Sequence, residues 1–347
     1  MAKKRITSQD VADLAGVSRT TVSFVINDVK QYNISPETRK KVQEAIKELG
    51  YVPNASARAL ATRSAKAIGL IMNRSPQYIL SDTFLPQIVG GLLSVVNQHQ
   101  LSLLVEWVDA EQQVETYRKL IKAKHIDGMI LLTPLLDDRG LKELESLEIP
   151  AVVMGELEDS NLSSVDIDNR LAAERAVQHL INLGHRKIAC VTNANLAFSS
   201  AFQRLAGYQD ALKDAGIEFD ETLIRHADFD PQSGHDAMTS LLDQGKDFSA
   251  VFVASDNVAI GAVSAIKEHN LSVPEDLSMI GFDDLPWSKF IDPPLTTIHL
   301  PALQLAQNAC FLLLEQIQDK DSIAKHLRLD FTLIDRKSTA PFGKQKQ

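Results

Sequence analysis

Apolar side chains in the first fifty residues recur at the spacing of an amphipathic helix, about 3.6 residues per turn. Three such stripes are present: Val11, Leu14 and Ala15; Val22, Val25 and Ile26; and Val42, Ile46 and Leu49. Polar residues fill the positions between them, which gives each helix one face for burial and one for solvent. The pattern predicts a small bundle of three helices at the start of the chain.

The first two of these helices are joined by a tight turn. Thr7 and Asp10 have the spacing of a capping box, Gly16 stands where the first helix must end, and Ser18 can cap the second helix. Two helices joined in this way have the geometry of a helix-turn-helix, whose second helix enters the DNA major groove. That helix has an outer face with side chains available for contact: Arg19, Thr20, Ser23, Phe24 and Asn27.

The third helix is delimited by Ser35 and Pro36 at its start and by Gly50 at its end. Basic side chains outside its apolar stripe either approach phosphates or solvate a surface helix: Arg39, Lys40, Lys41 and Lys47. Residues 55–61 favour a helix by composition but have almost no apolar stripe. This segment is therefore either a plain linker or a short helix that forms only against a partner.

From Ala67 onward, apolar runs alternate with amphipathic segments. The expected strands are residues 67–72, 101–107, 128–132, 150–154, 188–192, 223–226, 250–253 and 277–282. Helices are expected at 84–99, 110–124, near 141, 171–183, 202–215, 234–242, 259–269 and 302–317, with a crossover through residues 166–169. Repeated strand–helix units predict an α/β core of two doubly wound parallel-sheet lobes in series, preceded by the all-α head. Ligands in such folds bind at the carboxyl ends of the strands, here between the lobes.

Charge is unevenly distributed along the chain. At 347 residues with 44% hydrophobic content, more than one globular domain is expected, and the net charge is −9. Residues 1–66 carry 12 Lys and Arg against 6 Asp and Glu, whereas the remainder carries 24 against 39. A basic head on an acidic body fits a head that meets phosphate and a body that does not.

Several functional classes are disfavoured by the sequence. Residues 1–7 contain no apolar signal region and no run approaches the length of a membrane span, so neither a secretory signal nor a membrane partner is expected. Cys190 and Cys310 lie in apolar runs and are expected to be buried, reduced thiols. Phosphate-loop, nucleophile-elbow, zincin and dinucleotide-loop signatures are all missing, and the histidines are scattered. We expect no enzyme activity, no catalytic residues, no metal and no cofactor.

The whole chain resembles the LacI-type family of bacterial transcriptional regulators. The matching motifs of the head are Asp10-Val-Ala, Ala15-Gly-Val-Ser, Thr21-Val-Ser, Ser35-Pro-Glu-Thr-Arg and Leu49-Gly-Tyr-Val-Pro-Asn. Those of the core are Ala67-Ile-Gly-Leu-Ile, Leu183-Gly-His-Arg-Lys-Ile-Ala, Arg204-Leu-Ala-Gly-Tyr, Ser255-Asp, Ile280-Gly-Phe-Asp-Asp and Pro293-Pro-Leu-Thr-Thr-Ile. The resemblance implies a homodimer on a near-palindromic double-stranded DNA operator, with a periplasmic-binding-protein-like core that senses a small molecule.

The resemblance also implies the domain boundaries and the residues that contact DNA. The expected parts are a helix-turn-helix headpiece (1–52), a hinge helix and linker (53–66), a two-lobed core that also dimerises (67–340) and a flexible tail (341–347) without heptads. Arg19, Thr20 and Phe24 match base-reading positions, with Thr21 and Ser23 nearer the backbone. Phe24 stands where the family often has arginine, so it implies another base preference or a partly packing role. The remaining matches are phosphate-side Thr7, Ser18 and Asn27, and, in the hinge, the cap Asn54, the small Ala57 and the minor-groove wedge Leu60.

Five positions of the core match effector contacts of the family: Asn73, Arg204, Phe229, Ser255 and Asp283. Polar side chains there hydrogen-bond hydroxyls in sugar-sensing relatives, and the aromatic residue stacks on the ligand. We therefore expect a sugar as effector. Trp287 is a weaker candidate for a second ligand platform, and Trp107 either lines the cleft or, as we favour, packs at the dimer interface.

The predicted function is a cytoplasmic, nucleoid-associated, sequence-specific regulator, most often a repressor in this family, whose operator affinity is switched by its ligand. The alternatives of the same architecture respond to a purine, a nucleoside or a phosphoprotein. A solute-binding protein without a DNA role would need a secretory signal and no head, which is the reverse of this sequence.

Overall fold

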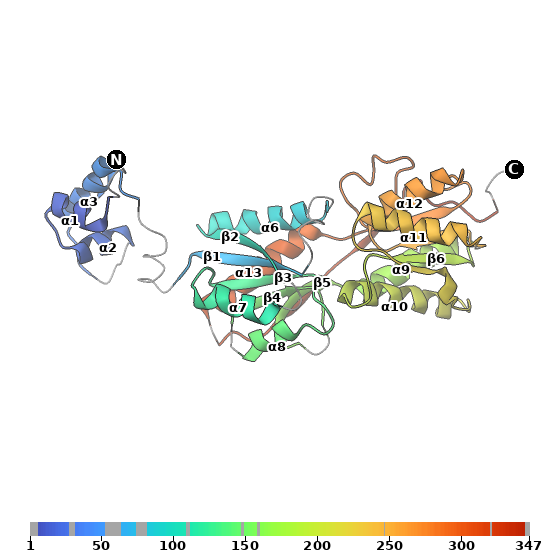
Figure 1. The fold of residues 1–347 in the computed structure, drawn as a ribbon, viewed down its shortest axis with the longest axis horizontal. Helices are drawn as coiled ribbons and strands as arrows, with labels where there is room; N and C mark the ends of the chain where they lie inside the picture. The colour runs from blue at the N-terminus through green and yellow to red at the C-terminus, as the bar shows by residue number, and fades with distance from the viewer. Residues whose placement is uncertain are drawn as a thin grey trace. The chain divides into compact units, whose positions relative to one another are not determined.

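The computed structural model describes residues 6–27, 32–52, 64–73, 82–108, 112–146, 149–157, 160–245, 247–319 and 321–343. The chain forms two compact units, Met1–Ala65 and Lys66–Gln347. In its described residues the first unit is helical, and the second is built on two six-stranded sheets. Figure 1 shows the elements with the labels used below.

The head contains α1 (Ser8–Ala15), α2 (Arg19–Ile26) and α3 (Pro36–Leu49). The expected capping box is present, because Thr7 and Asp10 each accept a hydrogen bond from the other's backbone, and Gly16 has a left-handed φ of 65°. The bundle closes over six buried side chains: Val11, Ala12, Val22, Val25, Val42 and Ala45. The placement of Leu14 in the buried stripe was wrong, since Leu14 is 47% exposed and Ala12 takes the inner position. In so short a helix, the face that packs is set by the other two helices.

We call lobe 1 the sheet of strand order β11-β5-β4-β3-β1-β2 with its helices. Its strands, all parallel, are β1 (Ala67–Met72), β2 (Ser102–Trp107), β3 (Gly128–Leu132), β4 (Ala151–Met154), β5 (Ser163–Ile167) and β11 (His326–Leu329). Its helices are α6 (Leu85–Gln98), α7 (Gln113–Lys122), α8 (Arg139–Ser146) and α13 (Ala302–Gln318). Side chains of α6 and α13 pack on one face of the sheet and those of α7 and α8 on the other.

Lobe 2 is the sheet of strand order β12-β10-β9-β8-β6-β7, in which only β12 is antiparallel among the described strands. Its strands are β6 (Ile188–Thr192), β7 (Ile224–His226), β8 (Ala250–Val253), β9 (Ser278–Asp283), β10 (Thr296–His299) and β12 (Thr332–Ile334). Its helices are α9 (Asn169–Asn182) and α10 (Ser199–Asp214) on one face, and α11 (Pro231–Asp243) and α12 (Asp256–Glu268) on the other. Helices on both faces explain why β6, β8 and β9 are buried along their whole length.

Two expectations about the core were wrong. Residues 166–169 were expected to form a crossover, but residues 166 and 167 end strand β5, which the sequence pattern missed along with β10, β11 and β12. The two lobes are not built in series, because α13 packs against α6 of lobe 1 and β11 pairs with β5 (Figure 1). The chain therefore passes between the lobes three times: from β5 to α9, from β10 to α13 and from β11 to β12.

The end of the chain is attached to lobe 2 as far as it is described. Phe342, in the segment expected to be a flexible tail, donates its backbone N–H to Leu183 O at 2.8 Å, and its ring contacts that of buried His185. Any free tail therefore begins after this residue. Cys190 and Cys310 are buried free thiols, as expected. None of the helices in the described part of the chain combines the length and apolar character needed to cross a membrane.

Candidate functional site

The face of the head that the sequence predicts to recognise DNA lies at the start of α2. Arg19 and Thr20 are exposed there, one residue after the cap Ser18. The Ser18 hydroxyl accepts from Thr21 N at 3.1 Å and pairs with the Thr21 hydroxyl at 2.9 Å. These bonds hold the first turn of the helix in place, and the Arg19 side chain on that turn is exposed.

Other predicted DNA contacts also have local partners within the head. The Asn27 amide donates to Ser23 O at 2.9 Å and to the Ser23 hydroxyl at 3.3 Å. The Phe24 ring stacks on Tyr32 with ring centroids 4.1 Å apart. This stacking supports the interpretation that Phe24 partly packs, and its contact with a base stays a prediction. The hinge residues Asn54, Ala57 and Leu60 lie outside the described residues.

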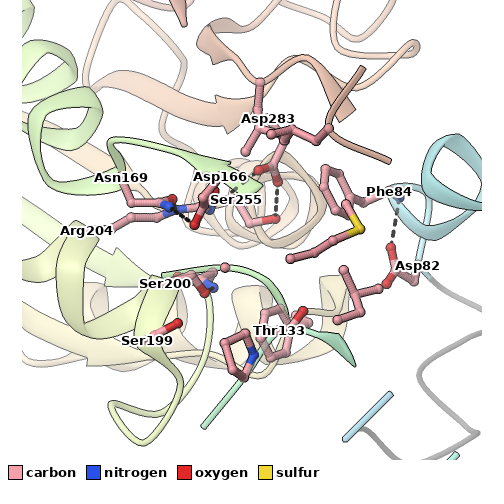
Figure 2. A pocket seen from close by; sticks show the side chains of 18 of the residues that line it. Asp82, Phe84, Thr133, Asp166, Asn169, Ser199, Ser200, Arg204, Ser255 and Asp283 are labelled. Carbon is pink, nitrogen blue, oxygen red and sulfur yellow. Dashed lines mark hydrogen bonds and ion pairs between the residues drawn. The ribbon is translucent and has the colours of Figure 1, made fainter. Parts of the chain in front are cut away.

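A pocket lies between the two lobes at the carboxyl ends of their strands, as the carboxyl-end rule predicts (Figure 2). The centre of a water molecule can occupy about 80 Å³ of it, which is room for several water-sized groups. Residues at or just after the ends of six strands line it: Thr133, Gly155, Asp166, Asn193, Ser255 and Asp283. Phe84 at the start of α6 and Ser199 and Ser200 of α10 complete its polar and aromatic walls.

Four of the five predicted effector residues line this pocket: Arg204, Phe229, Ser255 and Asp283. Asn73 is not among the lining residues, and its amide instead donates to the buried Asp138 at 3.2 Å. The sequence pattern could not show where the Asn73 side chain points, because its partner Asp138 lies in a loop 65 residues away in sequence. A ligand contact by Asn73 stays a prediction without support from the pocket geometry.

Arg204 is the centre of the polar cluster in Figure 2. Its Nε donates to Asn169 Oδ1 at 2.9 Å, and one terminal nitrogen donates to Ala254 O at 2.6 Å and lies 3.4 Å from Asp283 Oδ1. The guanidinium also sits 3.7 Å from the centroid of the Phe282 ring. Gly207 allows α10 to lie close enough to α9 for the contact between Arg204 and Asn169. A Cβ at position 207 would lie 2.0 Å from Arg170 O, so only glycine permits this approach.

Two carboxyl groups face Arg204 from different elements. Asp283 also accepts from the Ser255 hydroxyl at 2.9 Å and has a left-handed φ of 113°, a strained conformation of the kind that collects at functional sites. Burial raises the pKa of Asp166 to about 7, although Ile167 N–H, the Asn169 amide and the charge of Arg204 act in the opposite direction. Burial also lowers the pKa of Arg204, while Asp283 and Asp166 oppose this shift.

The sequence pattern missed several lining residues, although a signal was present. Asp166 and Asn169 fall within the predicted crossover, because the sequence pattern does not show β5. Asn193 and Thr133 directly follow strands whose bounds were predicted, so the carboxyl-end rule could have found both. The described residues contain no cluster of three or more His, Cys, Asp or Glu side chains that could hold a metal ion.

The two tryptophans lie away from the pocket lining. Trp287 bridges the lobes instead of forming a ligand platform, since its indole N–H donates to the Thr83 hydroxyl at 3.0 Å. The same hydroxyl lies 3.4 Å from Asn257 Oδ1. Trp107, on the sheet-edge strand β2, is 39% exposed, so its packing at a dimer interface stays a prediction.

Comparison with known proteins identifies the class of protein that carries this head and pocket. Residues 7–54 match the family model described as "Bacterial regulatory proteins, lacI family", and residues 177–339 match that of the periplasmic binding protein-like domain. The regulator CelR of Thermobifida fusca is 35% identical over 339 residues, which cover 97% of this chain and 99% of CelR. The repressor CytR of Escherichia coli K12 is 37% identical over 344 residues, covering 97% of this chain and 98% of CytR.

Solved structures agree with this assignment. The lac repressor dimer bound to operator and the anti-inducer ONPF has a TM-score of 0.85 and 31% identity, covering 97% of this chain and 100% of that chain. The CelR–cellobiose complex has a TM-score of 0.74 and 34% identity, covering 96% and 100%. The chain belongs to the lacI family of bacterial regulatory proteins. It is a DNA-binding transcriptional regulator with a two-lobed α/β core, so both the family and the fold class predicted from the sequence are confirmed.

Proposed function

We propose that the chain is a homodimeric repressor whose affinity for a near-palindromic operator is switched by a neutral, polyhydroxylated molecule, a sugar, bound between the lobes. The observation that carries the ligand class is the balance of charge in the pocket. Arg204 is the one Lys or Arg side chain among the described residues that line it, and Asn169, Ala254 and Asp283 already engage it. Asp82, Asp166 and Asp283 add carboxyl groups to the same lining.

A neutral ligand fits this lining better than an anion. A phosphate or carboxylate would meet acidic side chains without an unengaged cation to neutralise it, and uncompensated buried charge is costly. Hydroxyl groups both donate and accept, which matches the mixed donors and acceptors of Asn169, Ser255 and Asp283. The relative CelR was solved with cellobiose, a neutral sugar, which supports the same ligand class for this chain.

A nucleoside is the second candidate. Phe84 and Phe229 both line the pocket, and aromatic faces of this kind can stack on a base as well as on the apolar face of a sugar ring. The Phe229 ring is held edge-to-face against Phe198 with centroids 5.1 Å apart. The ribose hydroxyls of a nucleoside would then meet the polar groups around Arg204.

On the DNA side, α2 enters the major groove with Arg19, Thr20 and Phe24 toward the bases. Arg19 makes the bidentate contact to guanine, and Thr20 meets a base edge or a thymine methyl. Thr7, Ser18, Thr21, Ser23 and Asn27 lie on the backbone side, and the hinge residues Asn54, Ala57 and Leu60 enter the minor groove. Ligand binding changes the relative orientation of the lobes and hence the spacing of the two hinge segments, whose helices form or melt. The protein acts in the cytoplasm, with the DNA.

A thermal-melt comparison tests the ligand class. We expect neutral mono- or disaccharides to raise the melting midpoint and the corresponding sugar phosphates to leave it unchanged, because a ligand bound only by the folded state stabilises it by about 2.7 kcal/mol at a hundredfold excess over its dissociation constant. Arg204→Met should abolish the response, and Thr116→Val on α7, outside the pocket lining, should keep it. A response to adenosine alone would favour the nucleoside, and a response only to phosphorylated sugars would refute the neutral class.

A further inference from the structure

Five buried side-chain atoms in the described part of the chain have no hydrogen-bond partner: Asn73 Oδ1, Gln87 Nε2, Tyr117 OH, Asn193 Oδ1 and Thr239 Oγ1. Among these five residues, Asn193 alone lines the pocket between the lobes. It is 2% exposed. Nearly all acceptors buried to this degree are paired in folded proteins, so an unpaired one in a ligand pocket indicates a bond that the ligand completes.

The surroundings of Asn193 hold its side chain in one place. The residue directly follows β6, and its backbone oxygen accepts from Phe229 N at 2.7 Å. Its side-chain nitrogen donates to the Ser200 hydroxyl at 3.1 Å. The backbone of Asn193 is thus bonded to the Phe229 loop and its amide nitrogen to α10. The side-chain oxygen cannot turn toward another protein donor without breaking the hydrogen bond to Ser200.

We propose that Asn193 Oδ1 accepts a hydrogen bond from a hydroxyl group of the bound effector and that Asn193 determines which hydroxyl pattern the pocket accepts. This rests on the proposed function, since the hydroxyl belongs to the polyhydroxylated ligand class. A ligand with a hydroxyl at this position satisfies the buried oxygen. One that lacks it leaves the oxygen unpaired, which is how a site built for a hydroxyl rejects analogues without one.

Two variants separate this role from a structural one. Asn193→Leu keeps the approximate volume but removes the acceptor. Thr239→Val is the matched control, because it removes another unpaired buried atom of lobe 2, on α11 and outside the pocket lining. Melting midpoints of the two variants report whether each remains folded.

Calorimetric titration of the full-length protein with D-glucose, D-ribose, cellobiose and adenosine provides the readout. For the probe that binds best, we expect Asn193→Leu to weaken binding roughly tenfold to hundredfold, and Thr239→Val to stay within about threefold of the wild type. The wild type should bind one monodeoxy analogue of that probe more weakly than the probe itself, by the same factor. Asn193→Leu should bind this analogue and the probe with equal affinity.

Three other outcomes of these titrations would contradict the proposal, each for a different reason. Equal binding by the wild type and Asn193→Leu would overturn the role of Asn193 and leave the sugar-binding function standing. If every monodeoxy analogue lost as much further affinity with Asn193→Leu as with the wild type, no ligand hydroxyl would depend on Asn193, which also overturns the acceptor. Silence of the wild type toward all four probes would overturn the ligand class and the hydroxyl contact together.

Discussion

At the scale of single residues, Asp256 organises the lobe 2 side of the cleft without lining the pocket. It is fully buried and accepts from Leu285 N at 3.0 Å, from the Ser288 hydroxyl at 2.5 Å and from the Thr297 hydroxyl at 2.7 Å. Burial, together with the neighbouring Asp283, raises its pKa from an ordinary 3.8 to about 7. One carboxyl group thus ties α12 to β10 and to the loop that follows Asp283.

The raised pKa of Asp256 predicts a pH dependence of stability. Between pH 3.8 and about 7 the folded state holds a proton that the unfolded state releases, so this contribution is present at low pH and is lost as the pH rises through about 7. The melting midpoint of the wild type minus that of Asp256→Asn should therefore fall by about 2–4 °C from pH 5 to pH 8. Asp214→Asn, at an exposed position, should show no such trend. A pH-independent difference for Asp256→Asn would contradict the assignment.

At the scale of elements, the loop from Asp283 to Ser288 connects ligand contact with lobe contact. It begins with two left-handed residues, Asp283 and Asp284, with φ values of 113° and 53°. Asp284 is fixed by Arg336 at 2.5 Å and by His299 at 3.0 Å. Four residues after Asp283, Trp287 reaches Thr83 of lobe 1, whose neighbours Asp82 and Phe84 both line the pocket. The Trp287 indole therefore links the two lobes by a hydrogen bond beside the pocket.

We predict that loss of the Trp287–Thr83 hydrogen bond favours separation of the lobes. Thr83→Val removes the acceptor and Trp287→Phe the donor, and each should weaken effector binding about two- to tenfold, the size of one neutral hydrogen bond. In a Trp107→Phe background, where Trp287 is the sole tryptophan, Thr83→Val should also increase acrylamide quenching of its fluorescence. The same quenching in Thr83→Val as in its parent would show that this contact does not hold the indole.

At the scale of the whole molecule, the effector pocket and the DNA-contacting residues belong to separate compact units. The pocket lies entirely within Lys66–Gln347, and the predicted DNA contacts lie within Met1–Ala65. Within the core, three chain crossings join the lobes. A change in lobe orientation must therefore change the backbone conformation of all three crossings. β1, the strand that follows the head unit, is paired on both sides within the lobe 1 sheet, between β2 and β3. A movement of lobe 1 therefore carries the start of β1 with it.

This separation predicts a selective effect for Leu60→Ala. We expect operator affinity to fall at least about tenfold, because the side chain proposed to enter the minor groove is lost. Effector binding should be unchanged, since the pocket lies in the other unit. Operator titrations by fluorescence anisotropy and the thermal-melt response to the effector measure the two properties separately. Unchanged operator affinity would remove Leu60 from the DNA contacts.

Much of the local structure follows from the sequence by itself. Residues 67–72, 128–132, 188–192 and 250–253 form strands β1, β3, β6 and β8 with the predicted bounds. Continuous apolar runs mark strands covered on both faces, and glycine, proline and capping residues mark helix ends, so both signals are local. The family resemblance placed four effector residues in the pocket that the structure contains.

The tertiary structure alone decided which distant segments meet. The strand β11 is partly exposed and pairs at the edge of its sheet, so its sequence lacks the apolar run of a central strand. No local pattern shows that α13 belongs to lobe 1, because lobe membership depends on how often the chain crosses between the lobes. The pocket roles of Asn169 and Asn193 arise in the same way, since only folding brings Arg204 and Phe229, their partners, within hydrogen-bond distance. Periodicity records which side of an element is buried, and the packing of the whole chain determines what it is buried against.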